Sequence, residues 1–243
     1  MPPSASPGFA STQWSMVLAA RDGSSEAAQG AMQTLCATYW RPLYSFVRRS
    51  GRSVEDAQDL TQSFFSRLLD KEYLRHVDPA LGKFRAFLLA ALRNFLTNEW
   101  RREQAVKRGG QAQFVSIEEM TRAEDYYAAG ASATGTPEEI YERNWAVALL
   151  ERATRRLEEE FAAAGKSHIF AQLKPYLEGD RDGVRYAQVA AALEWSEVTV
   201  RVSVHRMRGR FRDLLQQEVA STLTDPSDQS AIDQELRYLL TVL

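Results

Sequence analysis

Hydrophobic residues recur at intervals of three and four along most of this chain, which is the spacing of an amphipathic α-helix. No stretch of the sequence shows the sustained alternation of hydrophobic and polar residues that indicates a β-strand. The pattern predicts an all-α protein, with helices at about residues 13–21, 25–49, 54–69, 83–104, 138–163, 167–178, 186–193, 197–219 and 230–242. Ser53, with Asp56 three residues later, suits the start of the third helix.

Two changes of composition divide the pattern into domains. The first residues are rich in Pro, Ser and Gly and are expected to be disordered. Between the helical blocks lie a Gly-Gly pair and the run AAGASATGTP, which predict a flexible linker. The expected organisation is a disordered start at 1–11, a helical domain at 12–107, a linker at 108–137, a helical domain at 138–219 and a tail at 220–243.

The tail carries a polar break, STLTDPSDQS, followed by an amphipathic helix whose apolar residues are Ile232, Leu236, Leu239, Leu240 and Leu243. The simpler interpretation of this helix is a packed structural appendage. It could also cover the second domain, or act as a partner-dependent switch.

The net charge of the 243 residues is only −2, which argues against a protein held to nucleic acid by its overall charge. The charges are nevertheless segregated along the chain. Residues 81–110 hold seven lysines and arginines against Glu99 and Glu103, and residues 197–212 hold five arginines against Glu197. The stretch between them is acidic, so two basic surfaces are expected.

Several classes of protein are disfavoured by the sequence. The single cysteine, Cys36, excludes an intrachain disulfide and has the flanks of a buried helical face. The start has no signal-peptide pattern, and AFLLAAL at 86–92 is too short to span a bilayer, so we expect a cytoplasmic protein without membrane insertion. His205 lacks metal-ligand spacing to His76 or His168, and no catalytic or phosphate-binding motif is found; we expect no enzyme, cofactor or metal.

The stretch 186–215 predicts two helices joined by a tight turn. On a helical wheel, Val200, Val204, Met207 and Phe211 of the second helix form one narrow sector, which should be buried. The opposite side is a narrow strip edged by arginines, which suits the major groove of DNA. An ordinary helical pair with a solvated basic face is the alternative.

The preceding helix places Val189, Ala190 and Leu193 on one face, and the small Ala190 allows the close helix crossing of a helix-turn-helix. The turn of this motif usually needs a residue in the left-handed conformation, most often glycine. Glu194 stands there instead, at a cost of about 1–2 kcal/mol if that conformation is kept. Either the turn differs or the protein tolerates the strain.

Three segments, VEDAQDLTQSFFSRLL, FRAFLLAALRNFLTNEWRRE and YAQVAAALEWSEVTVRVSVHRMRGRF, resemble in their order and spacing the sigma-70 family, specifically its extracytoplasmic-function (ECF) group. The resemblance covers about residues 12–219. It implies a sigma factor that binds core RNA polymerase, recognises the minus-10 and minus-35 promoter elements and directs transcription initiation. The alternative is a helix-turn-helix transcriptional regulator that is not a sigma factor.

The resemblance also implies partners and sites. The expected partners are promoter DNA and the largest-subunit clamp helices and flap of core polymerase, with an anti-sigma factor as a further candidate. By the same resemblance, the acidic linker is expected to run near the polymerase active-site cleft. Core binding is expected from Asp56, Asp59, Gln62 and Phe65. In the alternative, Phe65 completes the core with Ala57, Leu60, Thr61, Phe64 and Leu68, and the family's acids are missing at Gln58 and Ser63.

The helix at 83–104 and the loop before it are expected to handle the minus-10 element, because melting needs a basic surface and a platform for an unstacked base. The candidate residues are Arg93, Asn94, Asn98, Trp100, Arg101 and Arg102, with a specificity loop within Tyr73–Phe84. Trp100 suits base stacking and equally suits a place in the core.

The second basic helix is expected to bind the minus-35 element. Val198 and Val202 could contact thymine methyl groups, and Arg201, His205 and Arg206 are the favoured base-edge contacts. Arg208 and Arg210 are expected on phosphates.

Overall fold

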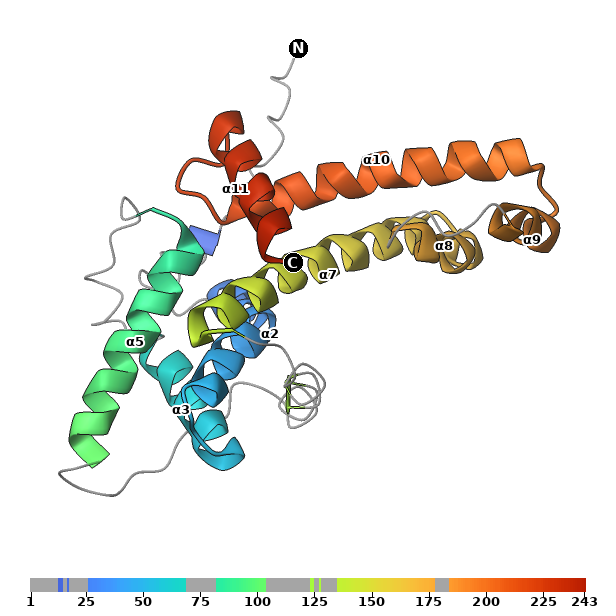
Figure 1. Cartoon of the computed structure of the whole chain (residues 1–243). Coiled ribbons are helices and arrows are strands. Elements are labelled where there is room, and N and C mark those ends of the chain that lie inside the picture. Colours follow the sequence, from blue (N-terminus) through green and yellow to red (C-terminus); the bar gives the residue numbers. More distant parts are fainter. Residues whose placement is uncertain are drawn as a thin grey trace, which may run out of the picture. The chain divides into compact units, whose positions relative to one another are not determined.

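The computed structural model describes residues 13, 14, 17, 26–68, 82–103, 123, 124, 127, 135–177 and 184–243. Every regular element in these ranges is helical, which confirms the predicted all-α fold (Figure 1). The elements are α2 (Glu26–Arg49), α3 (Val54–Leu68), α5 (Phe84–Glu103), α7 (Pro137–Ala163), α8 (Ser167–Leu173), the short 3₁₀ helix η2 (Lys174–Leu177), α9 (Val184–Leu193), α10 (Glu197–Ser221) and α11 (Gln229–Val242).

Local sequence signals set the helix ends. The Oγ atom of Ser53 accepts a hydrogen bond from the backbone N–H of Asp56 at 3.1 Å, as expected for the start of α3. The predicted helix at 167–178 is instead split between α8 and η2. Pro175 explains the change, because its ring nitrogen cannot donate the hydrogen bond that a continuing α-helix needs.

The contacts within the chain divide it into two compact units, residues 1–148 with 219–243 and residues 149–218. The expected domain limits at 138 and 219 differ from this division, since the first turns of α7 and the tail belong to unit 1. Figure 1 shows that α7 and α10 are continuous helices, and the boundaries fall inside both.

Unit 1 has an aromatic core that explains why it includes the start of α7. Tyr39 of α2 stacks on Trp145 of α7, with 4.2 Å between ring centroids and 10° between ring planes. The ring centroid of Phe84 in α5 lies 5.7 Å from that of Tyr39 and 6.3 Å from that of Trp145. Trp145 and Tyr141 have no exposed surface, so the first turns of α7 complete the core.

The tail helix α11 is packed, as the simpler interpretation expected. Ile232 and Leu239 are each 5% exposed, and the N-terminus is capped by Asp228, whose side chain accepts from the N–H of Ala231. The residues of the tail group with unit 1.

Part of the predicted linker is also packed in unit 1. Ala123 is 2% exposed, and the carboxylate of Glu124 accepts hydrogen bonds from the Tyr44 hydroxyl and from Arg48 at 3.1 and 3.2 Å. Burial opposes ionisation of Glu124, but the bonds from Arg48 and Tyr44 hold its pKa below the usual value. Ala123 and Glu124 both lie inside the stretch that the composition predicts as a linker.

Unit 2 is built from the second half of α7, from α8, η2 and α9, and from α10 as far as Glu218. Its core contains Ala153, Leu157, Phe170, Leu173, Tyr176, Tyr186, Val189, Ala190, Val200, Val204, Met207 and Leu214. The buried face predicted for the second basic helix is therefore confirmed at Val200, Val204 and Met207, while Phe211 is partly buried.

The turn between α9 and α10 keeps the left-handed residue, although it is not glycine. Glu194 has φ +55°. The N–H of Trp195 donates a hydrogen bond to the carbonyl of Ala190 at 2.9 Å, and the N–H of Glu194 donates to the carbonyl of Ala191 at 3.4 Å. Together these two bonds end α9 in a Schellman motif. Ser196 then caps α10 through the N–H of Thr199 at 3.1 Å. The protein thus retains the strain.

Candidate nucleic-acid interface

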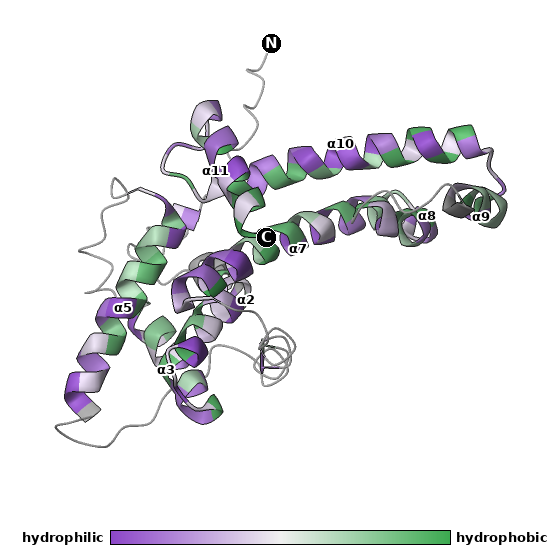
Figure 2. Cartoon of the chain, viewed as in Figure 1, coloured by the Kyte–Doolittle hydropathy of each residue, from purple (hydrophilic) through white to green (hydrophobic). Residues whose placement is uncertain are grey.

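Helix α5 changes character along its length. Its first half contributes Phe84, Leu88 and Leu92 to the core, each without exposed surface, and its second half is mostly polar. Figure 2 shows the same change as a passage from green to purple along the helix. The polar half leaves side chains available for a ligand.

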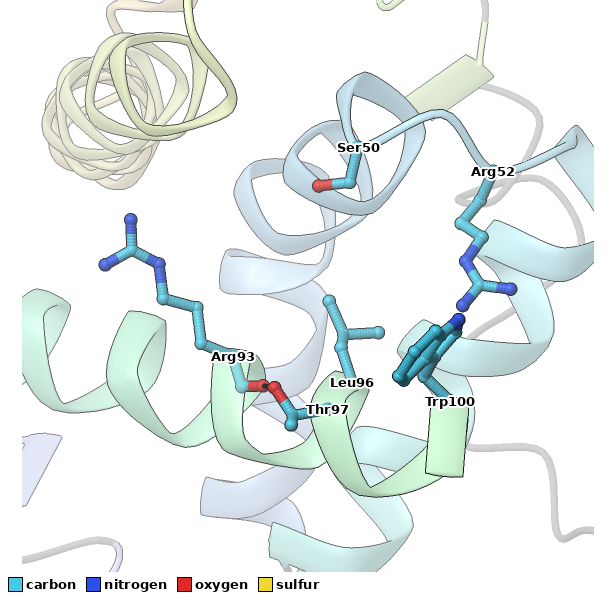
Figure 3. A pocket seen from close by; sticks show the side chains of 6 residues that line it. All are labelled: Ser50, Arg52, Arg93, Leu96, Thr97 and Trp100. Atoms are coloured by element: carbon cyan, nitrogen blue, oxygen red, sulfur yellow. Dashed lines mark hydrogen bonds between the residues drawn. The ribbon is translucent and has the colours of Figure 1, made fainter. Parts of the chain in front are cut away.

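All six predicted minus-10 residues are exposed, and they lie on more than one side of α5. Trp100 is 55% exposed, so it does not lie in the core, which was one of the two places expected for it. Arg93 and Trp100 line a pocket of about 460 Å³ (Figure 3). Asn94 and Asn98 line a different hollow of about 30 Å³.

Arg93 is occupied by a carboxylate of its own chain. Its guanidinium group donates a hydrogen bond to Glu138, in the first turn of α7. This bond holds the pKa of Glu138 below its usual value. The turn is fixed by a capping box in which the Glu139 carboxylate accepts from the N–H of Thr136 at 2.8 Å and the Thr136 hydroxyl accepts from the N–H of Glu139 at 3.2 Å. A carboxylate therefore stands where a phosphate could bind Arg93.

The basic residues at the start of α5 form ion pairs that are less exposed than the pair of Arg93. Arg85 donates to Glu142 of α7 and, at 2.6 Å, to Glu235 of α11, which also binds Lys83 at 2.6 Å. Arg85 and Glu235 are only 11% and 1% exposed. Burial raises the pKa of Glu142, against the attraction of Arg85. The basic surface expected over 81–110 is thus reduced to the second half of α5 among the described residues.

The exposed face of α3 carries only part of the predicted polymerase-binding set. Asp56 and Asp59 are exposed and Gln62 is half-buried. Phe65 has no exposed surface and stacks on Trp40 at 6.0 Å, so it belongs to the core, which is the alternative that the sequence left open. A side chain without exposed surface cannot contact a partner, and Phe65 is removed from the set.

The predicted buried face of α3 is confirmed. Ala57, Leu60, Thr61, Phe64 and Leu68 are all buried, as the helical wheel requires. The Oγ1 atom of Thr61 donates to the carbonyl of Ala57 at 2.7 Å, which satisfies the hydroxyl inside the core.

Helices α2, α3 and α5 coincide with a match to a known protein family. Residues 35–106 match the family model Sigma-70 region 2. The match runs from the buried part of α2 through the end of α5 and covers less than a third of the 243 residues. No curated protein and no solved structure matches the chain.

The sigma-70 region 2 match contains the predicted polymerase-binding and minus-10 residues but not α10. The first half of α10 presents an exposed strip of its own. Val198 is 71% and Val202 43% exposed, and Arg201, His205 and Arg206 are exposed beside them. Five predicted minus-35 residues therefore share one accessible surface in unit 2.

The other two predicted minus-35 residues are engaged within unit 2. The Nε atom of Arg208 donates to the carbonyl of Tyr176 at 2.9 Å, and Arg208 is half-buried. Arg210 makes two bonds to the carboxylate of Glu160, at 2.6 and 2.8 Å, which lower the pKa of that carboxyl. Both arginines make contacts within unit 2 in this structure, and their predicted contacts to phosphates stay predictions.

Long-range pairs such as Arg93 with Glu138 were missed by sequence reasoning. The acidic residues at the start of α7 were visible as a negative stretch, but nothing in their spacing indicated that they would meet α5. As a separate observation, none of the helices in the described residues is long and apolar enough to cross a membrane.

Proposed function

We propose that this chain is a sigma factor of the ECF group, which binds core RNA polymerase, recognises two promoter elements and carries out no chemical step itself. The observation that carries the proposal is the coincidence of the region 2 match with exposed basic and aromatic residues on α5. A cytoplasmic location follows from this role, and an anti-sigma factor is a possible regulator under it.

Region 2 handles the minus-10 element through the exposed half of α5. Trp100 offers an indole face for an unstacked base, and Arg93, Arg101 and Arg102 offer cations for the backbone. Asn94 and Asn98, beside their own hollow, can donate and accept hydrogen bonds at base edges.

Polymerase binding is assigned to the exposed side of α3. Asp56 and Asp59 supply negative charge and Gln62 supplies an amide, next to the rigid core formed by Phe64 and Phe65. The partner surface, by the family resemblance, is that of the clamp helices of the largest polymerase subunit.

The minus-35 element is assigned to α10, with α9 as the supporting helix of a helix-turn-helix. The exposed strip has apolar Val198 and Val202 for thymine methyl groups and basic Arg201 and Arg206 for guanine edges. The Schellman turn at Glu194 fixes the angle at which α10 leaves α9.

Transcription in vitro with purified core polymerase tests the proposal. With a pool of genomic templates, the full chain should direct specific start sites that core enzyme alone does not give. Asp59→Ala should reduce polymerase binding in a pull-down, while the matched substitution Asp213→Ala, on exposed α10, should not.

The outcome also separates the proposal from its alternative. A DNA-binding regulator that is not a sigma factor would bind duplex DNA but would not associate with core polymerase. Absence of both polymerase binding and specific start sites would contradict the sigma assignment.

A further inference from the structure

A glycine stands in the middle of α10, on the exposed strip of unit 2. Val198, Val202, His205 and Gly209 follow one another at intervals of four, three and four residues, so they share one side of the helix. The first three are exposed. Gly209 is therefore the position at which this strip carries no side chain.

Nothing in the described part of unit 2 explains a glycine at this position. Its backbone does not have the left-handed conformation of Gly165, and α10 continues beyond it to Ser221. A Cβ atom placed at Gly209 would meet no atom of the described chain within 4 Å, its neighbours in the helix aside. Alanine would thus fit here and would stabilise the helix, because a glycine inside a helix loses more conformational entropy on folding. The bare position points to a molecule that approaches α10 from outside.

The side chains around Gly209 suit a polyanion. Arg212, three residues farther along α10, is exposed at the edge of the strip. His205, four residues back, is exposed as well and can donate a hydrogen bond to a phosphate oxygen. Asp213 is also exposed, directly after Arg212, and its negative charge marks the end of the surface that a polyanion can cover.

The distance along the helix places Gly209 at the edge of a DNA groove. Gly209 lies eleven residues after Val198, which is about 16 Å along the helix axis. The major groove of DNA is about 12 Å wide. A helix whose first turns contact base edges therefore reaches the sugar–phosphate backbone at the rim of the groove near Gly209.

We propose that one strand of the bound DNA crosses α10 at Gly209, with its sugar–phosphate backbone against the bare helix and the adjoining phosphate on Arg212. The inference rests on the proposed function and adds Gly209 and Arg212 to the DNA contacts. The N–H groups in a helix interior are bonded within the helix, so the glycine contributes closeness rather than a new hydrogen bond. A methyl group there would hold the strand away from α10 and lengthen its contact with Arg212.

The test compares stability with affinity for DNA in Gly209→Ala. The probe is a fluorescein-labelled duplex that the full chain selects from a random pool. Fluorescence anisotropy gives its affinity for the chain alone and for the chain with core polymerase. The variant should unfold at a temperature about 2–4 °C higher, because alanine favours the helix. It should bind the duplex about 5-fold more weakly, since a methyl group forced into a close contact separates the two surfaces.

Gly30→Ala is the matched control. Gly30 is exposed inside α2 of unit 1, and a Cβ atom there also meets no atom of the described chain within 4 Å. This variant should gain similar stability and bind the duplex like the unchanged chain. Gly209→Leu should bind more weakly than Gly209→Ala, although leucine also favours the helix. A purely structural role of Gly209 would not move stability and affinity in opposite directions.

The phosphate contact is tested through Arg212. Arg212→Ala should reduce the slope of log affinity against log salt concentration by about 0.9, the value for one phosphate of duplex DNA. Arg155→Ala, exposed on α7 in the same unit, is the control for lost charge. The duplex is also scanned with single uncharged methylphosphonates. One of these should weaken binding of the unchanged chain and have no further effect in Arg212→Ala.

Gly209→Ala binding as tightly as the unchanged chain overturns the inference, as does an equal loss in Gly30→Ala or the absence of duplex binding by the chain in either form. If Gly209→Ala keeps its DNA affinity and loses polymerase binding instead, a protein and not DNA approaches α10 there. Polymerase association and specific start sites are measured separately. Their absence with the Gly209 effects intact would contradict the sigma function only, and their presence without these effects would contradict the role of Gly209 only.

Discussion

The two basic surfaces of this protein differ in how their charges are used. On α5 of unit 1, Arg85 and Arg93 are bound by carboxylates of α7 and α11, and Arg85 is nearly buried. On the first half of α10 in unit 2, Arg201 and Arg206 are exposed, and Arg201 lies 4.4 Å from the ring centroid of Tyr186 and 3.8 Å from the carboxylate of Glu197 in its own helix. Where acidic residues of a packed helix meet a run of basic residues, part of the basic charge is paired within the chain.

The largest effect should come from removing the buried carboxylate that pairs with the basic residues at the start of α5. Glu235→Ala leaves Lys83 and Arg85 without that carboxylate in a buried site, so the free energy of unfolding should fall by about 3–5 kcal/mol. Glu160→Ala, which breaks the exposed pair with Arg210 in unit 2, should cost about 1 kcal/mol or less. Urea unfolding followed by circular dichroism measures both. Equal losses would show that burial does not distinguish the two sets of pairs.

The exposed surface of α10 is tested through duplex binding. Arg206→Ala should weaken binding to a selected promoter sequence by about 1–3 kcal/mol, because a base-edge contact is lost. Arg155→Ala, exposed on α7 in the same unit, is the control for lost charge. Electrophoretic mobility shifts at fixed salt give the affinities. If both variants bind equally well, the strip on α10 is not the reading surface.

The strained turn of unit 2 offers a gain in stability. Glu194→Gly should raise the free energy of unfolding by about 1 kcal/mol, since glycine adopts the left-handed conformation without steric cost. Thermal unfolding measures the change. Gln188→Gly, at an exposed position inside α9, should instead lower stability by a similar amount. A loss of stability in Glu194→Gly would show that its side chain makes a contact worth more than the strain.

Removal of the Glu138 carboxylate, which is paired with Arg93 of α5, should change the affinity for single-stranded DNA. Glu138→Gln weakens the ion pair with Arg93, so the affinity for single-stranded DNA should rise by about 2- to 5-fold, the equivalent of an exposed ion pair. Glu158→Gln, exposed in unit 2, controls for the change in net charge. Unchanged affinity in Glu138→Gln, or an equal rise in both variants, would mean that Glu138 does not compete with DNA.

The smallest effects should appear in the pH dependence of stability. Glu160 has a lowered pKa, because Arg210 stabilises its charged form, so its contribution is present above about pH 4.5 and is lost as the pH falls. Glu142 has a raised pKa from burial, so its effect has the opposite sign and stability declines as the pH rises above about 4.5. Thermal unfolding from pH 3 to 7 should show that Glu160→Gln removes the first trend and Glu142→Gln the second. Parallel curves for the two variants would contradict this assignment.

The sequence by itself determined the helices and the faces that they bury. Intervals of three and four residues placed Leu60, Phe64 and Leu68 in the core of unit 1, and the same rule placed Val200 and Val204 in the core of unit 2. These features are local, because a helix is defined by hydrogen bonds between residues four apart. The conflict at Glu194 was also visible, since the turn chemistry depends on one residue and its neighbours.

The tertiary structure alone decided which charges are available and which apolar residues are covered. Glu138 and Arg93 are separated by 45 residues, and Arg85 and Glu235 by 150, so no local spacing connects them. Phe65 could have faced a partner or Trp40, and its helical position allowed both. Only the packing of α2 against α3 settled its place in the core. Periodicity specifies the helices, whereas the partners of their exposed edges depend on which helices the folded chain brings together.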